Sequence, residues 1–494
     1  MLSQFALLIL GFFSQRAMNL YMGAELVGMN GVISNVINIL SVTELGISTA
    51  IVYHLYGALA RKDEAEIASL MNLYRKAYHV FAVLVFAAGM AVLPFIHLFM
   101  KNNSYSLSYI RVLYAMWLVR TVLSYLLTYR KSLLIADQKE YIASITGLIL
   151  NVVSYLAIIL LVTWEQNYLL ALGIGTVTAV VLNIWISWYV EQKYPFLRQR
   201  RKEKSTSSLT KRIVRDLKSL FISRISEKML YCTDNLIISG FIGVGTVGRY
   251  ANYCMITQAI SNILTILANT IQPTVGDYFT EKNRQRNYEI LRQLTFGFFC
   301  IASVVSVGLF SLITPFVRDI WLGPSYELGW GITVFCIVVL LVRIMGLPLS
   351  LVMGVTGLFE KEKNVGASSA LLNLIVSLAL VKPYGMAGVL LGTLLSYLLQ
   401  ILYRYIIYFR DFLEMPGEAL RYAQDIGEYL AVIAGEVLLM QKIVPLIYGA
   451  GGMLLFCVCF LLCIAIPLLL DLVIFGRGWR LQSIVTMVKG MRKA

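Results

Sequence analysis

Long apolar segments follow one another along almost the whole chain, and they leave very few folds open to it. Runs of about twenty apolar residues, each long enough to cross a bilayer as a helix, number about fourteen. Only 14% of the 494 residues are charged and 59% are hydrophobic, which is not the composition of a soluble domain. We therefore predict an all-α polytopic membrane protein with about 14 transmembrane helices, because helices satisfy their own backbone hydrogen bonds in lipid. The segments lie near 1–20, 27–58, 77–100, 107–134, 141–162, 167–190, 219–241, 247–275, 291–317, 328–356, 364–381, 385–409, 427–448 and 451–474.

Lysine and arginine are concentrated in every second loop between these segments. The formal charge is +15, and most of the 42 basic residues follow even-numbered segments or lie in the C-terminal tail. Basic loops remain on the cytoplasmic side, so we expect a multi-pass protein of the plasma or inner membrane with both termini in the cytoplasm. The densest basic stretch, 191–218, is interpreted as a linker beside anionic lipid headgroups and not as a nucleic-acid site.

The chain resembles itself at an offset of about 220 residues, which indicates an internal duplication. The string GAELVG at 23–28 aligns with GVGTVG at 243–248, Arg120 with Arg343, and Asn151 with Asn373. Six helices per repeat is an even number, so both repeats enter the membrane with the same orientation, a pattern of transporters whose substrate site lies between the repeats. We expect a six-helix lobe at 1–190, the linker 191–218, a second lobe at 219–410, two additional helices at 427–474 and a basic tail at 475–494.

Arg120 and Arg343 lie at matching places in the two repeats, each at the end of the string LVR inside an apolar segment. A guanidinium at membrane depth costs roughly a few kcal/mol or more. Each arginine can pair with a carboxylate such as Glu44 or extend to the interface, which would be a structural role. Two arginines at equivalent depth favour the other interpretation, a charged cavity.

The segment at 219–241 carries polar residues at helical spacing. Arg224, Glu227, Lys228, Tyr231, Asp234 and Asn235 recur at steps of three and four, so they share one face. This face is either a structural ion-pair cluster or a cavity wall, because unpaired ions cannot face lipid.

The intramembrane cations outnumber the anions in the two lobes, so such a cavity would favour an anion. Arginine binds phosphate particularly well through its planar set of donors. The candidate phosphate contacts are Arg16, Arg120, Arg224, Lys228 and Arg343, and the candidates for gating or ion coupling are Glu44, Glu227 and Asp234.

Other patterns do not indicate catalysis, a cofactor or a metal. The string at 243–248 matches GxGxxG, but it follows a membrane segment instead of a strand. No GxxxxGK[ST] loop for ATP phosphates occurs, and His54, His79 and His97 lack the spacing of metal ligands. The expected exterior loops are short for an enzyme that must hold a sugar acceptor, so we expect neither an enzyme nor a bound cofactor.

Four strings resemble those of a known family. They are YMGAELVGMNG at 21–31, TELGISTAI at 43–51, TDNLIISGFIG at 233–243 and VGRYANY at 247–253. They are similar to the polysaccharide-transport flippases of the multidrug/oligosaccharidyl-lipid/polysaccharide exporter superfamily, which include the O-antigen and capsule flippases. The resemblance implies two six-helix lobes, alternating access and a central cavity with basic residues, here Arg120, Arg224 and Arg343.

The same resemblance implies a substrate and partners. The substrate would be an undecaprenyl-diphosphate-linked oligosaccharide, moved from the cytoplasmic to the outer leaflet for lipopolysaccharide or other cell-surface polysaccharides. Glycosyltransferases and a polymerase of the same assembly system would be partners. A cation-coupled multidrug exporter is the alternative, but cationic drugs call for a carboxylate-rich cavity. A membrane-embedded polymerase or glycosyltransferase is disfavoured by the short exterior loops.

Overall fold

The computed structural model describes residues 2–41, 47–198, 228–229, 232–279, 283–449 and 451–476. Regular structure in these residues is helical throughout, and no strand occurs among them. Nine helices within the described residues are long and apolar enough to cross a membrane. The expected all-α polytopic membrane fold is therefore confirmed.

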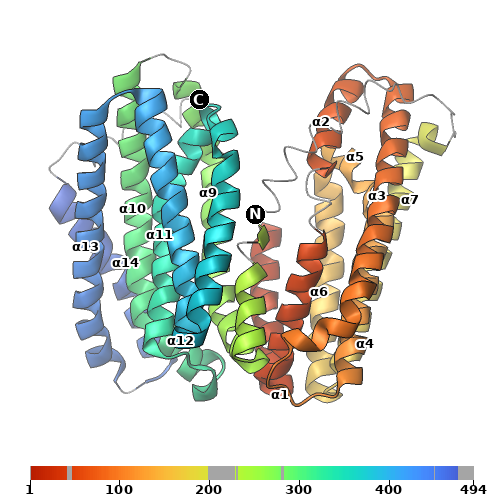
Figure 1. Cartoon of the computed structure of the whole chain (residues 1–494), viewed down its shortest axis with the longest axis horizontal. Helices are drawn as coiled ribbons and strands as arrows, with labels where there is room; N and C mark the ends of the chain where they lie inside the picture. The colour runs from red at the N-terminus through yellow and green to blue at the C-terminus, as the bar shows by residue number, and fades with distance from the viewer. Residues whose placement is uncertain are drawn as a thin grey trace. The chain divides into compact units, whose positions relative to one another are not determined.

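The chain forms two compact units, Met1–Ala251 and Asn252–Ala494. In each unit the long helices lie side by side (Figure 1). The helices of the first unit are α1 (Leu2–Leu40), α2 (Ile47–Ala60), α3 (Glu64–Val92), α4 (Leu107–Thr128), α5 (Lys131–Ala136), α6 (Glu140–Trp164), α7 (Tyr168–Lys193) and the first turns of α9 (Val244–Tyr278), with 3-10 turns at Leu93–Phe99 and Pro195–Arg198.

The second unit contains the rest of α9 and five further long helices. A hydrophobic cluster that includes Leu291, Leu349, Ile407 and Tyr422 packs four of them together. They are α10 (Arg284–Pro315), α11 (Trp330–Val355), α12 (Phe359–Ile407), α13 (Pro416–Tyr448) and α14 (Met453–Phe475), with short turns at Phe316–Trp321, Pro324–Tyr326 and Tyr408–Leu413.

Glycines with positive φ divide two of the longest helices. Gly385 (φ 57°) interrupts α12, and beyond it the chain runs back along itself, since Asn373 Nδ2 donates to Thr393 Oγ1 at 2.9 Å. Gly23 (φ 83°) interrupts α1 in the same way. Such backbone conformations favour glycine. Although α1 and α12 are each assigned as one helix, each therefore consists of two helical segments that meet at the glycine.

Two segments differ from the ranges expected from hydropathy. The run at 107–134 is two helices, α4 and α5, and between them Arg130 forms a 2.5 Å ion pair with Glu191 at the end of α7. The run at 27–58 is shared between α1 and α2, with residues 42–46 outside the described part. Hydropathy averaged over a window does not detect a single charged residue or a short break.

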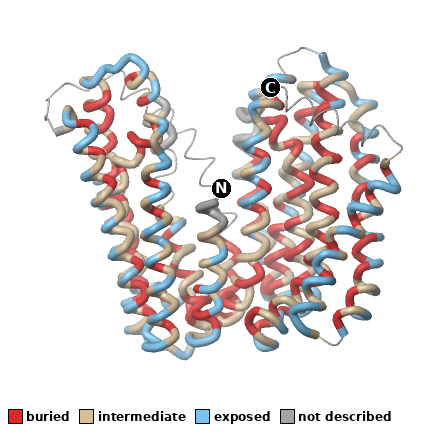
Figure 2. Tube along the Cα trace, turned by 180° about the vertical axis from the view of Figure 1, so that it is seen from behind, coloured by how far each residue is buried: buried red, intermediate tan, exposed pale blue. Residues whose placement is uncertain are grey.

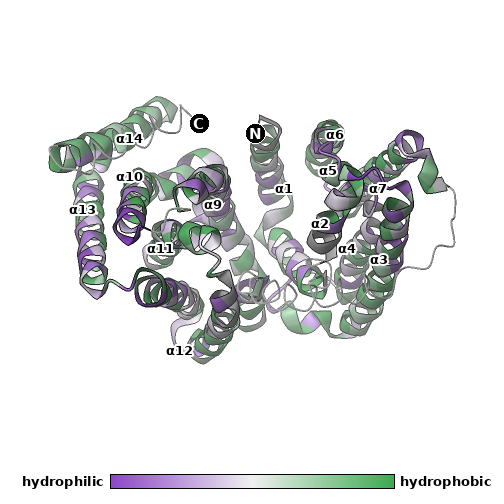
Figure 3. Ribbon diagram, turned by 90° about the horizontal axis from the view of Figure 1, so that it is seen from above, coloured by the Kyte–Doolittle hydropathy of each residue, from purple (hydrophilic) through white to green (hydrophobic). Residues whose placement is uncertain are grey.

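The surface of α6 shows which medium surrounds the helices. Ile145, Ile149 and Val153 are 56%, 58% and 52% exposed along one face, whereas Gly147 and Ser154 are buried. This is the reverse of a soluble helix, whose exposed face is polar. Figure 2 shows such exposed stretches along the outer helices, and Figure 3 shows that many of their residues are hydrophobic. An apolar outer face matches hydrocarbon.

Candidate functional site

Arg120 and Arg343 occupy the same position in their helices. Helix α4 begins at Leu107 and α11 at Trp330, so each arginine lies 13 residues after the first residue of its helix (120 − 107 and 343 − 330). At about 1.5 Å per residue this is about 20 Å along each helix. The two arginines that the repeat aligns thus lie at the same distance from the starts of two separate helices.

Arg120 lies inside the helical bundle of the first unit, against an aromatic ring. Its guanidinium carbon is 5.2 Å from the centre of the Trp117 ring, a cation–π distance. A Cβ at Gly175 on α7 would be 3.6 Å from Arg120 Nη1, so the glycine provides space for the cation. Among the residues that the structure describes, no carboxylate lies within 4 Å of this guanidinium, and its expected alternative partner, Glu44, lies outside them.

Two hydrogen bonds fix the ring that supports Arg120. Trp117 Nε1 donates to Asn30 Oδ1 at 2.8 Å, and the Tyr168 hydroxyl donates to the same oxygen at 2.6 Å. Asn30 belongs to α1 and Tyr168 begins α7, so three helices hold Trp117 in one orientation. The position of Arg120 is therefore preorganised.

Arg343 has a similar environment in the second unit. Its guanidinium carbon is 5.5 Å from the centre of the Tyr397 ring on α12. Both arginines are half-buried and each lies against an aromatic face. For Arg120, which has no carboxylate within 4 Å among the described residues, the cation–π contact leaves the positive charge un-neutralised.

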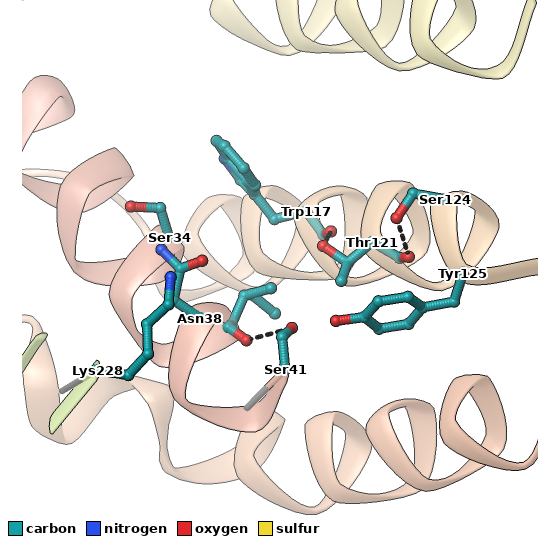
Figure 4. Close-up of a pocket in the computed structure, with 9 residues that line it drawn as sticks. Ser34, Asn38, Ser41, Trp117, Thr121, Ser124, Tyr125 and Lys228 are labelled. Carbon is teal, nitrogen blue, oxygen red and sulfur yellow. Dashed lines mark hydrogen bonds between the residues drawn. The ribbon is translucent and has the colours of Figure 1, made fainter. Parts of the chain in front are cut away.

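A polar cavity of about 190 Å³ opens beside Trp117 in the first unit (Figure 4). Among the described residues, its walls are hydroxyl, amide and indole groups with one ammonium group and the Ile37 side chain, and no described carboxylate lines it. Donors of this kind suit an anionic or sugar-like ligand. The lining residues are Ser34, Ile37, Asn38 and Ser41 of α1, Trp117, Thr121, Ser124 and Tyr125 of α4, and Lys228.

The other residues expected to form the site are distributed differently. Lys228 lines the cavity, and within the described residues no carboxylate lies at ion-pair distance from it. Asp234 is buried, at 6% exposed, whereas Arg16 is exposed on α1. Arg224, Glu227 and Glu44 lie outside the described residues. In the first unit, Lys228 thus lines the cavity directly, and Arg120 lies against Trp117, which also lines it.

The uncharged lining residues were not among the site residues predicted from the sequence. The polar residues of α4 in this wall, Trp117, Thr121 and Ser124, are spaced by four and three, as a helical stripe requires. Those of α1, Ser34, Asn38 and Ser41, have the same spacing. A search for small polar residues at helical spacing inside apolar segments would have identified both stripes.

One end of the first unit is held together by the loop between α3 and α4. Lys101 Nζ donates to the Phe241 carbonyl at 2.8 Å and Asn102 Nδ2 to the Ile242 carbonyl at 3.0 Å. In the same loop the Ser104 backbone N–H donates to Glu25 Oε2 at 3.0 Å. The loop therefore joins the turn before α9 to the turn within α1, which are the corresponding turns of the two repeats.

Residues 1–279, more than half of the chain, match the family described as polysaccharide biosynthesis protein. The chain belongs to this family. No curated protein matches the chain in sequence. The resemblance expected from the four sequence strings is confirmed.

Solved structures similar to this chain include a lipid II flippase and multidrug transporters. The lipid II flippase MurJ in an inward closed conformation is 15% identical with a TM-score of 0.69, covering 96% of this chain and 98% of that one. An inward-facing MATE transporter of the MOP superfamily is 12% identical with a TM-score of 0.64, covering 83% and 94%. The MATE multidrug transporter DinF-BH is 15% identical with a TM-score of 0.57, covering 83% and 93%. At sequence identities this low, the structural likeness shows a common fold and nothing more.

Proposed function

We propose that this protein is a flippase that moves an undecaprenyl-diphosphate-linked oligosaccharide from the cytoplasmic to the outer leaflet of the cell membrane. It would do so by alternating access through a cationic cavity. The glycan would be a precursor of a cell-surface polysaccharide such as capsule or O-antigen. Glycosyltransferases that build it and a polymerase that extends it are the partners that fit this role.

The observation that carries the proposal is Arg120, a cation held on Trp117 without a carboxylate within 4 Å in the described part of the chain. A diphosphate cannot enter hydrocarbon without its hydration, and fixed donors can replace that hydration. Arginine donates to two phosphate oxygens at once, whereas lysine provides a point charge. Arg343 at the same depth in α11, Lys228 in the cavity wall, and Arg16 and Arg224 are the further cations proposed to contact the diphosphate.

The hydroxyl and amide groups of the cavity support the sugar part of the proposal. Ser34, Asn38, Thr121 and Tyr125 present donors and acceptors toward one space. Sugars are recognised by such groups, and the polyprenyl chain would remain in lipid against the apolar outer faces of the helices. A multidrug exporter of organic cations would gain little from a wall whose described residues contribute an ammonium group and no carboxylate.

Flipping by the purified protein in vesicles tests this function. The probe is a fluorescent undecaprenyl-diphosphate oligosaccharide whose exposure is followed with a membrane-impermeant quencher. We expect wild-type protein to move the probe, and Arg120→Ala and Arg343→Ala each to reduce the rate by at least about tenfold, the loss of one charge-assisted contact. Arg111→Ala, which replaces an exposed arginine of the same helix as Arg120, provides a comparison of the same chemical change.

Two results would contradict the proposal. One is normal flipping by both buried-arginine variants at normal protein levels in the membrane. The other is wild-type protein that moves a cationic dye and leaves the lipid-linked oligosaccharide in place, which would indicate a multidrug exporter.

A further inference from the structure

Helices α10, α13 and α14 pack together in the second unit, and polar groups join α10 to α13 at two levels. At the first level Arg292 donates to both oxygens of Asp425, at 2.6 and 2.9 Å. Eleven residues further along each helix, Ser303 Oγ donates to Glu436 Oε2 at 2.6 Å. The same step on both helices shows that they run in parallel, with the second level about 16 Å beyond the first.

The second level holds two buried carboxyl groups. Glu436 is 3% exposed and Asp471 on α14 is 4% exposed. Glu436 Oε1 and both oxygens of Asp471 have no hydrogen-bond partner among the described residues. Ser303 donates to Glu436, and the contact of Phe475 with Phe299 places Asp471, one turn earlier on α14, at the level of Ser303, one turn later on α10. Asp471 lies on the buried face of α14, between Pro467 and Phe475.

Aromatic rings separate this level from the Arg292–Asp425 pair. Phe299, one turn before Ser303, stacks on Tyr429 with ring centres 4.5 Å apart. Phe475, one turn after Asp471, contacts both rings at 5.5 and 5.8 Å. The carboxyl groups are thus shielded on this side by apolar surface, where an unneutralised charge is costly.

No described cation lies close enough to neutralise the two acids. Arg292 is engaged by Asp425 about 16 Å away, and Arg343 of α11 lies over Tyr397. Of the other titratable groups on the three helices, Cys300 lies at this level, and Tyr429 and Cys463 lie about two turns away along their helices; none of them carries positive charge. Two carboxylates in one buried site cannot both be ionised without compensation, so the site must hold a proton.

We propose that Glu436, Ser303 and Asp471 form a proton-binding site in which the two carboxyl groups hold one proton. The protonated Asp471 donates to Ser303 Oγ, and the Ser303 hydroxyl donates to the ionised Glu436. Every hydroxyl hydrogen then has an acceptor, and one negative charge remains in place of two. When the proton leaves to water, both acids are ionised and repel each other, which opposes the packing of α14 on α10.

The composition of the site favours a proton over a metal ion. Two carboxyl groups and one hydroxyl provide fewer oxygen ligands than a calcium ion requires. In the described part of the chain, no three histidine, cysteine or acidic side chains come together as metal ligands do. A proton needs only the two acids and the serine between them. Whether this site holds a proton can be measured without any transport assay. The proposal therefore does not depend on the substrate proposed above.

Infrared spectroscopy of the full-length protein in lipid nanodiscs tests the proposal. We expect a carbonyl band of a protonated carboxylic acid at neutral pH in wild type and in Asp425→Asn, because both oxygens of Asp425 already accept hydrogen bonds from Arg292. The double variant Glu436→Gln/Asp471→Asn should lose the band. A wild-type protein without the band, or a double variant that keeps it, overturns the proposal.

A second measurement needs only the wild-type chain, so it does not depend on how the variants fold. Dicyclohexylcarbodiimide adds to a protonated buried carboxyl group without a leaving group, and peptide mass spectrometry locates the adduct. We expect modification of Glu436 or Asp471 at neutral pH, declining as the pH rises, at least about tenfold above modification of Asp425. Equal modification of Asp425, or none at Glu436 and Asp471, contradicts a shared proton.

Discussion

Gly28 and Gly248 contact each other reciprocally where α1 and the start of α9 cross. A Cβ at Gly28 would overlap the carbonyl oxygen of Val244 and lie 2.9 Å from Gly248 N. A Cβ at Gly248 would overlap the carbonyl oxygen of Ala24 and lie 3.0 Å from Gly28 N. The two positions correspond in the repeat, so the contact has the symmetry of a two-fold interface formed within one chain.

Alanine at either glycine should open this crossing. The carbonyl groups that a Cβ would meet are backbone and cannot move aside, so we expect Gly28→Ala and Gly248→Ala each to destabilise this arrangement by about 1–3 kcal/mol. A cysteine at Gly245 should then react faster with a membrane-impermeant maleimide. Gly31→Ala is the matched control, since its Cβ would meet only Val247 Cγ1 at 3.8 Å. Unchanged labelling in both variants would show that the crossing accommodates a Cβ without opening, which contradicts the prediction.

For flipping, the aromatic ring of Trp117 against Arg120 should matter more than the hydrogen bond from Trp117 to Asn30. Trp117→Ala removes the cation–π contact, worth about 0.5–2 kcal/mol, so we expect flipping in vesicles to fall by roughly two- to thirtyfold. Trp117→Phe keeps a ring under the guanidinium and loses only the bond to Asn30, so its rate should remain close to wild type. Equal losses in the two variants would instead indicate that the Asn30 bond positions the site.

Asp234 is expected to couple transport to an ion gradient, because its buried position makes a change of charge costly. We expect Asp234→Asn to bind the lipid-linked oligosaccharide normally and to lose any dependence of flipping on an imposed pH or sodium gradient. Glu165→Gln, at the exposed C-terminal end of α6, is the control and should behave as wild type. A gradient dependence that survives in Asp234→Asn would exclude this role.

Hydropathy and charge predicted the helical class because a bilayer imposes length and polarity on every crossing helix. The equal depth of Arg120 and Arg343 also followed from aligning the repeats, since insertions between corresponding helices are small. The cavity wall did not follow, because window hydropathy and charge patterns do not mark isolated uncharged residues such as Ser34, Asn38 and Thr121, although their helical spacing does. The breaks at Gly23 and Gly385 were located to within a few residues, because the apolar segments 1–20 and 27–58, and 364–381 and 385–409, are separated there.

A pH-dependent stability is expected at Asp137, in the turn between α5 and α6. Burial alone would raise the pKa of this carboxyl group, but hydrogen bonds from Lys139 and the Tyr194 hydroxyl outweigh it and lower the pKa. A lowered pKa in the folded state stabilises the protein above the pKa of the unfolded chain, and the contribution is lost as the pH falls through the folded value.

Asp137→Asn should therefore lower the thermal unfolding temperature at neutral pH. The corresponding loss in the free energy of unfolding is about 1 kcal/mol, because the cluster is partly exposed. The difference from wild type should shrink below about pH 4. Tyr194→Phe removes one of the two hydrogen bonds and should give a smaller shift of the same sign. The unfolding of both variants in nanodiscs, followed across the acidic range, provides the measurement. A difference that stays constant or grows as the pH falls would show that the Asp137 carboxylate does not contribute through its charge.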